Sequence, residues 1–525
     1  MTVMHVLRHL MLLSVGSNLV WFSATPLLAQ TPLTPTNRSV SGSSSLLPLN
    51  PNPDPLALPA QPAQVQINLN QPLTLQQAIE VGRRNNRDLQ VLELQLQQSR
   101  SALRQSQAAL YPTLSFQSSL ARTDSAAAKL ANAQAASNAA QVQQSFAQLL
   151  QAGGFTPVQT TLLQAFLTGA QGTQTAGTTS NTFDNTVQLS YNVFSSGQRE
   201  ASIRAAREQV RDAEFALDLQ AEQLRLDITD AYYNIQQADA LVRIAQAAVE
   251  NSQISLRDTE ARFRAGLGTR FDVLQAQVQL ANNQQQLTQA LSQQQTARRQ
   301  LAQVLSVADN VNLTAADPIQ IAGRWTLSLE DSIVLGFRNR VELAQQLTQR
   351  NVALQQRRIA LANLGPQFNI GASFDTTDAL ADSQAPTWGY SVGGQLNWQI
   401  FDGGASRASA AQQEASAAIA ETQFANFKNL IRFQIEQAFY ALQANFENIQ
   451  TNRVAVTQAT EGLRLARLRF QAGVGTQLDV SNAETSLTQA QSNLLSATIN
   501  YNRSLASLQR FVSNLPLTFA APGGS

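Results

Sequence analysis

Apolar side chains recur every seven residues along two stretches of the chain, 198–264 and 405–471, each 67 residues long. The recurring positions are Ile228, Ile235, Val242, Val249, Leu256 and Phe263 in the first stretch and Ile435, Leu442, Ile449, Val456, Leu463 and Phe470 in the second. Each position in the second set lies 207 residues after its counterpart. A sustained seven-residue repeat is typical of helices that pack side by side. The pattern predicts two helices of roughly 100 Å.

Two shorter stretches before each long helix alternate apolar and polar residues. Their apolar positions are Leu114, Phe116 and Leu120; Phe183, Val187, Leu189, Tyr191 and Val193; Phe368, Ile370, Ala372 and Phe374; and Trp388, Tyr390, Val392, Leu396, Trp398 and Ile400. Alternation over about ten residues is typical of strands that cross a membrane with one face toward lipid. A half-buried strand of a soluble sheet has the same pattern, so each stretch alone is a weak indication.

The elements around these stretches also occur twice. Residues 73–109 and 327–364 share a helical pattern, with Leu75, Ile79, Gly82 and Leu89 matched 254 positions later. Helical patterns also follow the long helices, at 270–306 and 477–512. Internal repeats define the fold before any local assignment. The sequence therefore predicts one unit present twice, in residues 73–313 and 314–512, each a helix, a strand pair, a long helix, a tip and a helix.

The first unit carries an insertion between its two strands. Residues 121–182 are rich in Ala, Gln, Gly and Thr, whereas the matching gap in the second unit is about a dozen residues. This difference accounts for the change of offset between the units. The insertion contains an amphipathic run, Ala126–Leu150, and is expected to be a long loop that is partly helical or disordered.

A repeated motif joins each long helix to the helix after it. It reads RFRAGLGTRFDVLQA at 262–276 and RFQAGVGTQLDVSNA at 469–483. Glycine accepts the left-handed conformation that ends a helix, and threonine is a good N-cap for the next one. Each copy therefore predicts the tip of a helical hairpin. One copy alone favours a purely structural corner, but two copies at matched positions favour a functional tip.

The ends of the chain differ from the repeats. Residues 1–29 resemble a secretory signal, with Arg8 near the start, an apolar run Leu10–Phe22, and Ala24 or Ala29 suited to precede cleavage. That run is shorter than the ~20 apolar residues of a spanning helix. Residues 30–72 contain nine prolines and predict an extended or disordered linker, and residues 513–525 form a short tail.

Composition excludes several classes of function. Charged residues are 14% of the chain, and the net charge of +1 argues against a nucleic-acid partner. The chain has no cysteine, and its two histidines, His5 and His9, lie within the predicted signal. Thiol catalysis, histidine triads and the usual zinc sites are therefore excluded from the processed chain. We expect no catalytic residue, no metal and no cofactor, so an enzyme such as a secreted hydrolase is disfavoured.

Four predicted membrane strands are too few for one chain. Four strands cannot close a barrel, and an open edge in lipid leaves backbone groups unpaired. Two copies would give eight strands with a filled interior, whereas three would give twelve and room for a pore. The fold class is therefore mainly α with membrane β, in a chain that oligomerises around a helical cylinder.

The repeat layout and the tip motifs AGLGTRFDVLQA and AGVGTQLDVSNA resemble the TolC-like outer-membrane efflux protein family over about residues 73–512. The resemblance implies a homotrimer in outer-membrane lipid, with a 12-stranded transmembrane β-barrel and an α-barrel in the periplasm. It also implies an exit duct that docks a periplasmic adaptor (membrane fusion) protein and an inner-membrane pump of the ABC, RND or a similar class. The implied adaptor contacts are Gly266, Leu267, Gly268, Thr269, Gly473, Val474, Gly475 and Thr476.

The resemblance also implies a periplasmic entrance beside Asp272, Asp479 and Arg270. A ring of such carboxylates favours cations, but each also suits the positive end of the helix it begins. The sequence departs from the best-known pattern at Ala472, Gln477 and Asn482, where some members have Tyr, Arg and Asp. Arg270 is a candidate substitute for the missing arginine.

Two further alternatives stay open at the level of sequence. One is a structural or adhesive coiled-coil protein of the envelope without a pore, which has no use for the alternating strands. The other is type I protein secretion in place of small-molecule efflux, because the same duct serves both and the pump decides.

Overall fold

The computed structural model describes most of the two repeats. The described residues are 56, 58–67, 69–154, 156–159, 161–162, 165, 179–308, 310–380 and 385–512. The predicted signal at 1–29, the linker up to residue 55 and the predicted tail at 513–525 lie outside them. Everything described belongs to one unit, Leu49–Ser525.

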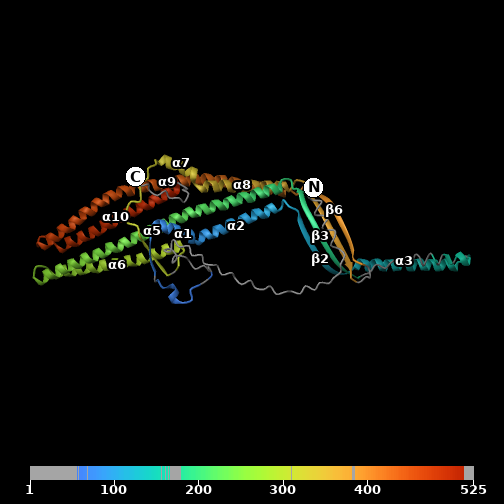
Figure 1. Cartoon of the computed structure of the whole chain (residues 1–525), viewed down its shortest axis with the longest axis horizontal. Coiled ribbons are helices and arrows are strands. Elements are labelled where there is room, and N and C mark those ends of the chain that lie inside the picture. Colours follow the sequence, from blue (N-terminus) through green and yellow to red (C-terminus); the bar gives the residue numbers. More distant parts are fainter. Residues whose placement is uncertain are drawn as a thin grey trace, which may run out of the picture. The chain divides into compact units, whose positions relative to one another are not determined.

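The two long helices have the bounds that the sequence predicts. Helix α5 spans Gln198–Arg264 and α9 spans Ala405–Gln471, each with 67 residues (Figure 1). Each begins at a glycine with positive φ, which favours glycine over residues with a Cβ. Helix α6 (Arg270–Leu305) returns along α5, and α10 (Gln477–Val512) returns along α9. The predicted pair of helical hairpins is thereby confirmed.

The helix predicted ahead of each strand pair is in fact two helices. Residues Leu75–Asn85 form α1 and Arg87–Ala108 form α2, with Asn86 extended between them (ψ 125°) and capping α2 by accepting from the Leu89 amide. The second repeat breaks in the same way. Its helices are α7 (Leu329–Asn339) and α8 (Val341–Ala362), separated by Arg340.

Close packing of α1 and α7 explains this break. A Cβ on Gly82 would lie 2.3 Å from Cδ1 of Ile228, and one on Gly336 would lie 2.4 Å from Cδ1 of Ile435. These glycines let the short helices approach the long ones, and a bend is needed to bring them there. The glycines matched between the repeats were visible in the sequence, but the bend was not predicted.

A four-stranded antiparallel sheet has the order β2-β3-β5-β6. Its strands are β2 (Thr113–Asp124), β3 (Thr179–Phe194), β5 (Gln367–Ala379) and β6 (Thr387–Asn397). The register aligns Phe116, Val187, Phe374 and Tyr390 across the sheet. The next row is polar, with Ser115, Gln188, Ser373 and Ser391. The predicted alternation thus puts apolar and polar side chains on opposite faces.

The insertion at 121–182 includes more regular structure than a loop. Strands β2 and β3 extend into its two ends, and helix α3 spans Ala126–Gln151, which confirms the helical part of the expectation. Residues 166–178 lie outside the described part.

A second, smaller sheet was not predicted. Strand β1 (Leu69–Leu73) pairs in parallel with β4 (Val311–Ala315), and a 3-10 helix at Pro62–Val65 precedes it. These strands cross the predicted boundaries at 72/73 and 313/314. The Tyr232 hydroxyl of α5 donates to the carbonyl of Leu73 in β1 at 3.0 Å and so joins this sheet to α5.

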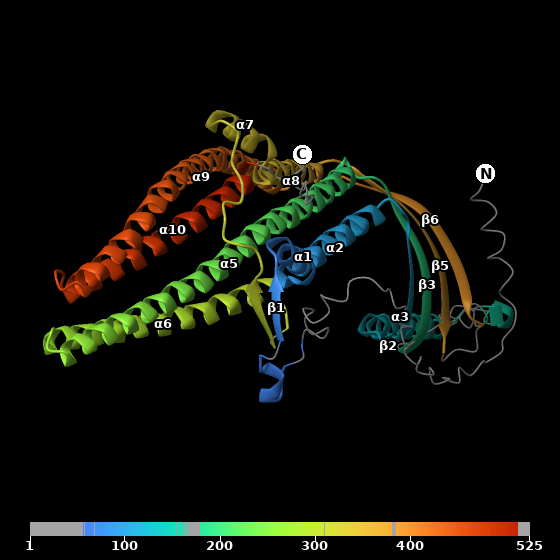
Figure 2. The ribbon, with the colours of Figure 1, turned by 60° about the vertical axis from the view of Figure 1, so that its left-hand side comes forward.

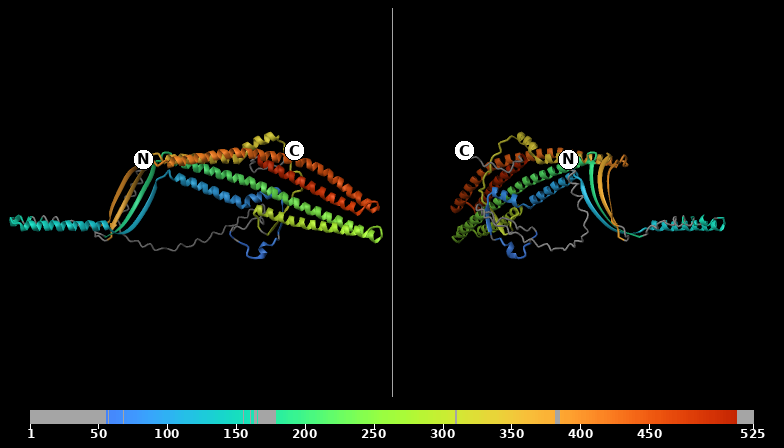
Figure 3. Two further views of the ribbon diagram at one scale, coloured as in Figure 1. Left: turned by 180° about the vertical axis from the view of Figure 1, so that it is seen from behind. Right: turned by 45° about the vertical axis from the view of Figure 1, so that its right-hand side comes forward.

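The two long helices have different surroundings. Helix α5 contacts α1, α2, α6, α8 and α10, whereas α9 contacts α7, α8 and α10 (Figure 2). One apolar cluster lies in the second repeat, and its buried members are Leu343, Ile431, Ile435, Ala438, Leu442, Ile449, Ala497, Tyr501, Leu505, Leu508 and Val512. Both hairpin turns lie at the end of the helices away from the four-stranded sheet (Figure 3). No helix in the described ranges has the length and hydropathy needed to span a bilayer.

Candidate functional site

The first half of each tip is a helix C-terminus closed by glycine. After α5, Gly266 (φ 75°) lets the Leu267 amide donate to the Arg262 carbonyl (2.8 Å) and the Gly266 amide donate to Phe263 (3.0 Å). This pair of bonds is the Schellman motif. In the second tip, Gly473 (φ 78°) has the same role.

The second half of each tip is a capping box. The Thr269 hydroxyl accepts from the Asp272 amide, and Asp272 Oδ2 accepts from the Thr269 amide at 2.9 Å. Thr476 and Asp479 repeat both bonds. Bonds from the Thr476 amide and hydroxyl hold the pKa of Asp479 below its usual value. Both predicted entrance carboxylates therefore have a structural role in their own helices.

Large apolar side chains project from these capped turns. Leu267 is 70% exposed and Val474 is 71% exposed, and the side chains after them, Phe271 and Leu478, are also exposed. Phe271 and Leu478 occupy matched positions just inside the following helices, and the sequence analysis did not single them out. The sequence did contain a sign of them, because each repeat has a large apolar residue between the capping threonine and the aspartate of its tip. Arg270 is exposed, and its side chain makes no hydrogen bond or ion pair among the described residues.

One arginine joins the two tips. Arg262 Nη1 donates to the carbonyls of Phe470 (2.7 Å) and Gln471 (3.2 Å), and its guanidinium lies over the Phe470 ring, 4.7 Å from the centroid. A cation at a helix C-terminus is favoured because the last carbonyls are unpaired and carry partial negative charge. The side chain of Arg469, the counterpart of Arg262, makes no hydrogen bond within the described ranges, and only its backbone carbonyl accepts from Val474 and Gly475. The link between the tips is therefore one-sided.

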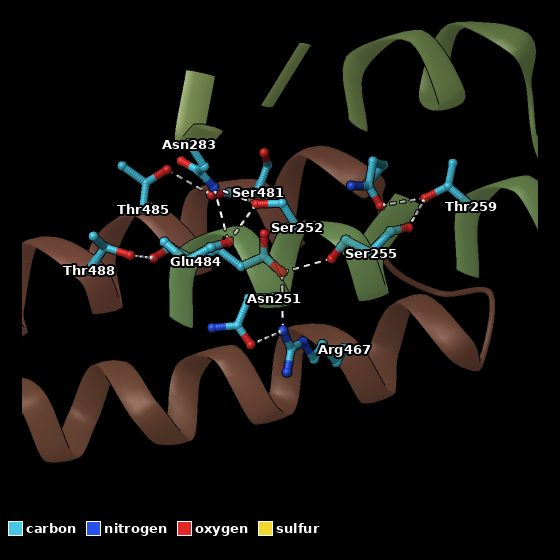
Figure 4. Close-up of polar contacts among 12 residues, drawn as sticks. Asn251, Ser252, Ser255, Thr259, Asn283, Arg467, Ser481, Glu484, Thr485 and Thr488 are labelled. Atoms are coloured by element: carbon cyan, nitrogen blue, oxygen red, sulfur yellow. Dashed lines mark hydrogen bonds and ion pairs between the residues drawn. The ribbon is translucent and has the colours of Figure 1, made fainter. Parts of the chain in front are cut away.

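Polar contacts continue behind the tips, between α5 and the second hairpin (Figure 4). Ser255 Oγ donates to the buried Glu484 carboxylate at 2.7 Å, and Arg467 Nη2 lies 3.1 Å from the same oxygen. Arg467 also reaches Asn251 at 2.8 Å. Neither the serine nor the glutamate was predicted, because the contact joins residues 229 positions apart.

The three departures from the family pattern have different surroundings. Gln477 is buried and accepts from the Thr259 hydroxyl at 3.0 Å, so it takes part in the link between the hairpins. Ala472 is the C-cap of α9. Asn482 is exposed, and its carbonyl accepts from Ser486.

The tips offer binding surface rather than reactive groups. Among the described residues, no group of three or more His, Cys, Asp or Glu side chains has the arrangement of a metal site. The chemistry available at the tips is hydrophobic contact, backbone amides and a few charges, which suits docking to another protein.

Comparisons with known proteins agree with this architecture. Relatives include the outer membrane efflux protein BepC of Brucella suis, 27% identical over 196 residues, which are 35% of this chain and 40% of BepC. The pyoverdine export outer membrane protein OpmQ of Pseudomonas putida is 28% identical over 323 residues, 60% of this chain and 66% of OpmQ. The chain thus matches less than two thirds of the length of either relative.

The fold is similar to that of a solved outer membrane protein. The crystal structure of the outer membrane protein VceC from Vibrio cholerae superposes with a TM-score of 0.65 at 19% identity, covering 83% of this chain and 95% of VceC. The family model described as outer membrane efflux protein matches residues 74–307 and 337–513, which include most of each repeat and both tips. The chain therefore belongs to the outer membrane efflux protein family.

Proposed function

We propose that the chain is the passive exit duct of a tripartite efflux or type I secretion system and that it works as a trimer. The observation that carries this proposal is an incomplete set of contacts. Within one chain, a surface of the first repeat contacts a surface of the second repeat. The matching surface on the other side of each repeat is left uncovered. A ring of identical chains would cover all of them.

The sheet gives the first example. Within the chain, β3 of the first repeat pairs with β5 of the second. The counterpart of β3 is β6 and that of β5 is β2, and these two are the edge strands. Pairing β6 of one copy with β2 of the next repeats the internal contact and removes both edges, which in lipid would leave backbone groups unpaired at several kcal/mol each.

The helices give the second example. Tyr233 on α5 is only 6% exposed because α1 and α10 cover this face. Its counterpart on α9, Tyr440, is 58% exposed. Tyr440 belongs to an exposed stripe with multiples of seven residues between its members, which are Ile419, Phe433, Tyr440, Val454 and Leu468. The counterpart of α1 is α7, which contacts α9 in the same chain, whereas the counterpart of α10 would be α6 of a neighbouring copy.

The number of copies follows from the strands. Three chains of four strands would give a 12-stranded barrel, whereas two would give eight strands and an interior filled by side chains. The apolar row with Phe374 would face lipid, and the polar row with Ser373 would line the pore. Helices α5 and α9 would continue the pore as an α-barrel through the periplasm.

The tips are proposed to dock a periplasmic adaptor protein. Gly266, Gly268, Thr269, Gly473, Gly475 and Thr476 shape the turns. Leu267 and Val474 present the apolar contacts, and Phe271 and Leu478 extend them. Shallow, exposed apolar groups on rigid capped turns suit a helical hairpin of the adaptor, which links the duct to an inner-membrane ABC, RND or similar pump. We assign the chain no catalytic step.

Asp272, Asp479 and Arg270 are proposed to border the periplasmic entrance. Three copies of each carboxylate around a narrow opening would attract divalent cations. Single-channel currents test this idea against the capping role described above. Asp272→Asn and Asp479→Asn should weaken block by divalent cations, and unchanged block in both variants would leave only the capping role.

Conductance of the purified protein tests the main proposal. The full chain in detergent should have the mass of a trimer and should conduct ions after insertion into planar bilayers. A folded oligomer that passes no current would support a structural envelope protein instead. Replacing Leu267 and Val474 with Asp should leave conductance intact but abolish crosslinking to the adaptor, since apolar contact is lost while the turns are kept.

A further inference from the structure

A cavity of about 170 Å³ lies between α1, α5 and α10, and no residue of either tip lines it. Two arginines, Arg225 and Arg510, line it together with the polar side chains of Thr229, Tyr233 and Asn502. The lining contains no carboxylate. The polar part of the cavity wall is therefore cationic or neutral. Helices α1 and α5 of the first repeat and α10 of the second repeat all contribute to this wall.

A buried ion cluster stands behind this wall. Glu342 accepts from Arg340 Nη2 at 2.7 Å and from Arg510 Nη2 at 3.1 Å, and Glu222 accepts from Arg225 Nη2 at 2.9 Å. All five residues are at least nine-tenths buried. Three arginines face two glutamates, so the cluster has one positive charge in excess. Unbalanced charge is costly in a protein interior because the surrounding medium solvates it poorly.

The electrostatics of two members of the cluster agree with this count. Burial acts to raise the pKa of Glu342, but hydrogen bonds and charge from Arg340, with Arg510 contributing, hold it below its usual value. Glu342 is therefore ionised, and its two neighbours share one negative charge. Burial lowers the pKa of Arg510, and the charge of Arg340 adds to this effect, whereas Glu342 and Glu222 act against it.

Hydrogen-bond donors at the cavity lack acceptors. The buried Arg510 Nε has no partner. The hydroxyl of Tyr233, which also lines the cavity, makes no hydrogen bond within the described residues, but unlike Arg510 Nε it keeps some exposed surface. Burial raises the pKa of Tyr233 to about 12, so this hydroxyl stays protonated and able to donate. Asp317 and Asp230 contribute to that shift, but neither lines the cavity.

We infer that this cavity binds one small oxyanion, a carboxylate or a phosphate group, through Arg225, Arg510 and Tyr233. Such a ligand supplies the negative charge that the cluster lacks and the acceptors that its donors lack. Charge-assisted bonds from arginine to carboxylate or phosphate are the strong ones in proteins. The bound anion would join α1 of the first repeat to α10 of the second.

The site occurs once in each chain, because its counterpart keeps only one of the two arginines. On α9 the matching residues Arg432 and Tyr440 face outward, and Arg432 pairs with Glu436 at 2.8 Å. The residue of α6 that corresponds to Arg510 is Gln303. In the proposed trimer, α6 of a neighbouring copy would cover Arg432 and Tyr440 and would bring Gln303 to the position that Arg510 has in the cavity. The expected stoichiometry is one anion per chain.

Equilibrium dialysis of the full-length protein in detergent tests the inference, with radiolabelled phosphate in one arm and acetate in the other, at constant ionic strength set with chloride. We expect saturable binding of one anion per chain in at least one arm. Binding only of phosphate identifies a phosphate site, and binding only of acetate identifies a carboxylate site. Absence of saturable binding in both arms overturns the inference.

Matched variants locate the binding. Tyr233→Phe removes only the unpaired hydroxyl and should weaken binding by roughly tenfold, the loss expected for a hydrogen bond to a charged group. Tyr440→Phe makes the same change at the exposed counterpart and should bind as the wild type does. Arg510→Gln should abolish binding, and far-ultraviolet circular dichroism shows whether it folds. If it does not fold, wild-type affinity in Tyr233→Phe is by itself enough to reject the site.

Discussion

Helices α5 and α9 have the same length and matching positions, yet they occupy different environments. Tyr233 and Arg225 on α5 are buried, whereas Tyr440 and Arg432 at the matched positions of α9 are exposed. The cause is the packing of the repeats, because α8 and α10 of the second repeat contact α5, whereas the helices that contact α9 (α7, α8 and α10) all belong to its own repeat.

This difference bears on the proposed trimer. In the first repeat, α5 makes contacts with the second repeat that α9 does not make within the chain. The residues that α9 exposes are therefore the ones expected to form the proposed contact between chains. Variants made at matched positions of the two helices test this interpretation directly.

The largest effect is expected from the arginine pair. Arg225→Met should lower the free energy of unfolding by about 3–5 kcal/mol, because it leaves Glu222 buried and unpaired. Arg432→Met, at the exposed counterpart, should cause no measurable change. Thermal and denaturant unfolding of both variants in detergent gives the comparison, and equal losses would contradict the difference in environment.

Acidic substitutions on the apolar stripe come next. Phe433→Asp should leave the chain helical but dissociate the trimer, at a cost of about 2–3 kcal/mol for each apolar side chain lost from the interface. Leu226→Asp, the counterpart on α5, should instead impair folding of the single chain. Native mass spectrometry and circular dichroism separate these outcomes, and a Phe433→Asp variant that remains trimeric would exclude the stripe from the interface.

A smaller effect is expected from the link between the tips. Arg262→Ala removes the bonds to the Phe470 and Gln471 carbonyls and should destabilise the tip region by about 1–2 kcal/mol. Arg469→Ala removes no such bond and serves as the control. Hydrogen exchange at the ends of α5 and α9 should increase only in the first variant.

The smallest effect should be the same in both repeats. Thr269→Ala and Thr476→Ala each remove one helix cap, at a cost of about 1 kcal/mol. Their hydrogen-exchange changes should agree, since the two capping boxes have the same bonds. Unequal changes would show that the tips differ beyond the Arg262 contact.

Local chemistry explains what the sequence predicted well. Heptad positions located α5 and α9, alternation located the strands, and the glycines and threonines at 266–269 and 473–476 located both tips. Each of these signals acts within a few residues along the chain.

Contacts between distant residues explain what it missed. The bend at Asn86 follows from packing against α5, and the Arg262 and Glu484 contacts join residues more than 200 positions apart. The acidic residues of the tips were predicted to be important, but their capping bonds became visible only in the structure. The exposure of Phe271 and Leu478 could not be predicted either, because the exposure of a side chain depends on all the elements around it.

The parallel pair of β1 and β4 constrains how the protein is made. Asn70 and Asn312 are partners across this pair, 242 positions apart. Because the chain is synthesised from its N-terminus, β1 stays unpaired until residue 315 has been made. The first repeat therefore cannot finish folding before synthesis of the second repeat has begun. Maturation is thereby tied to synthesis of both halves, and a product truncated before β4 would retain an unsatisfied strand as a target for quality-control proteases.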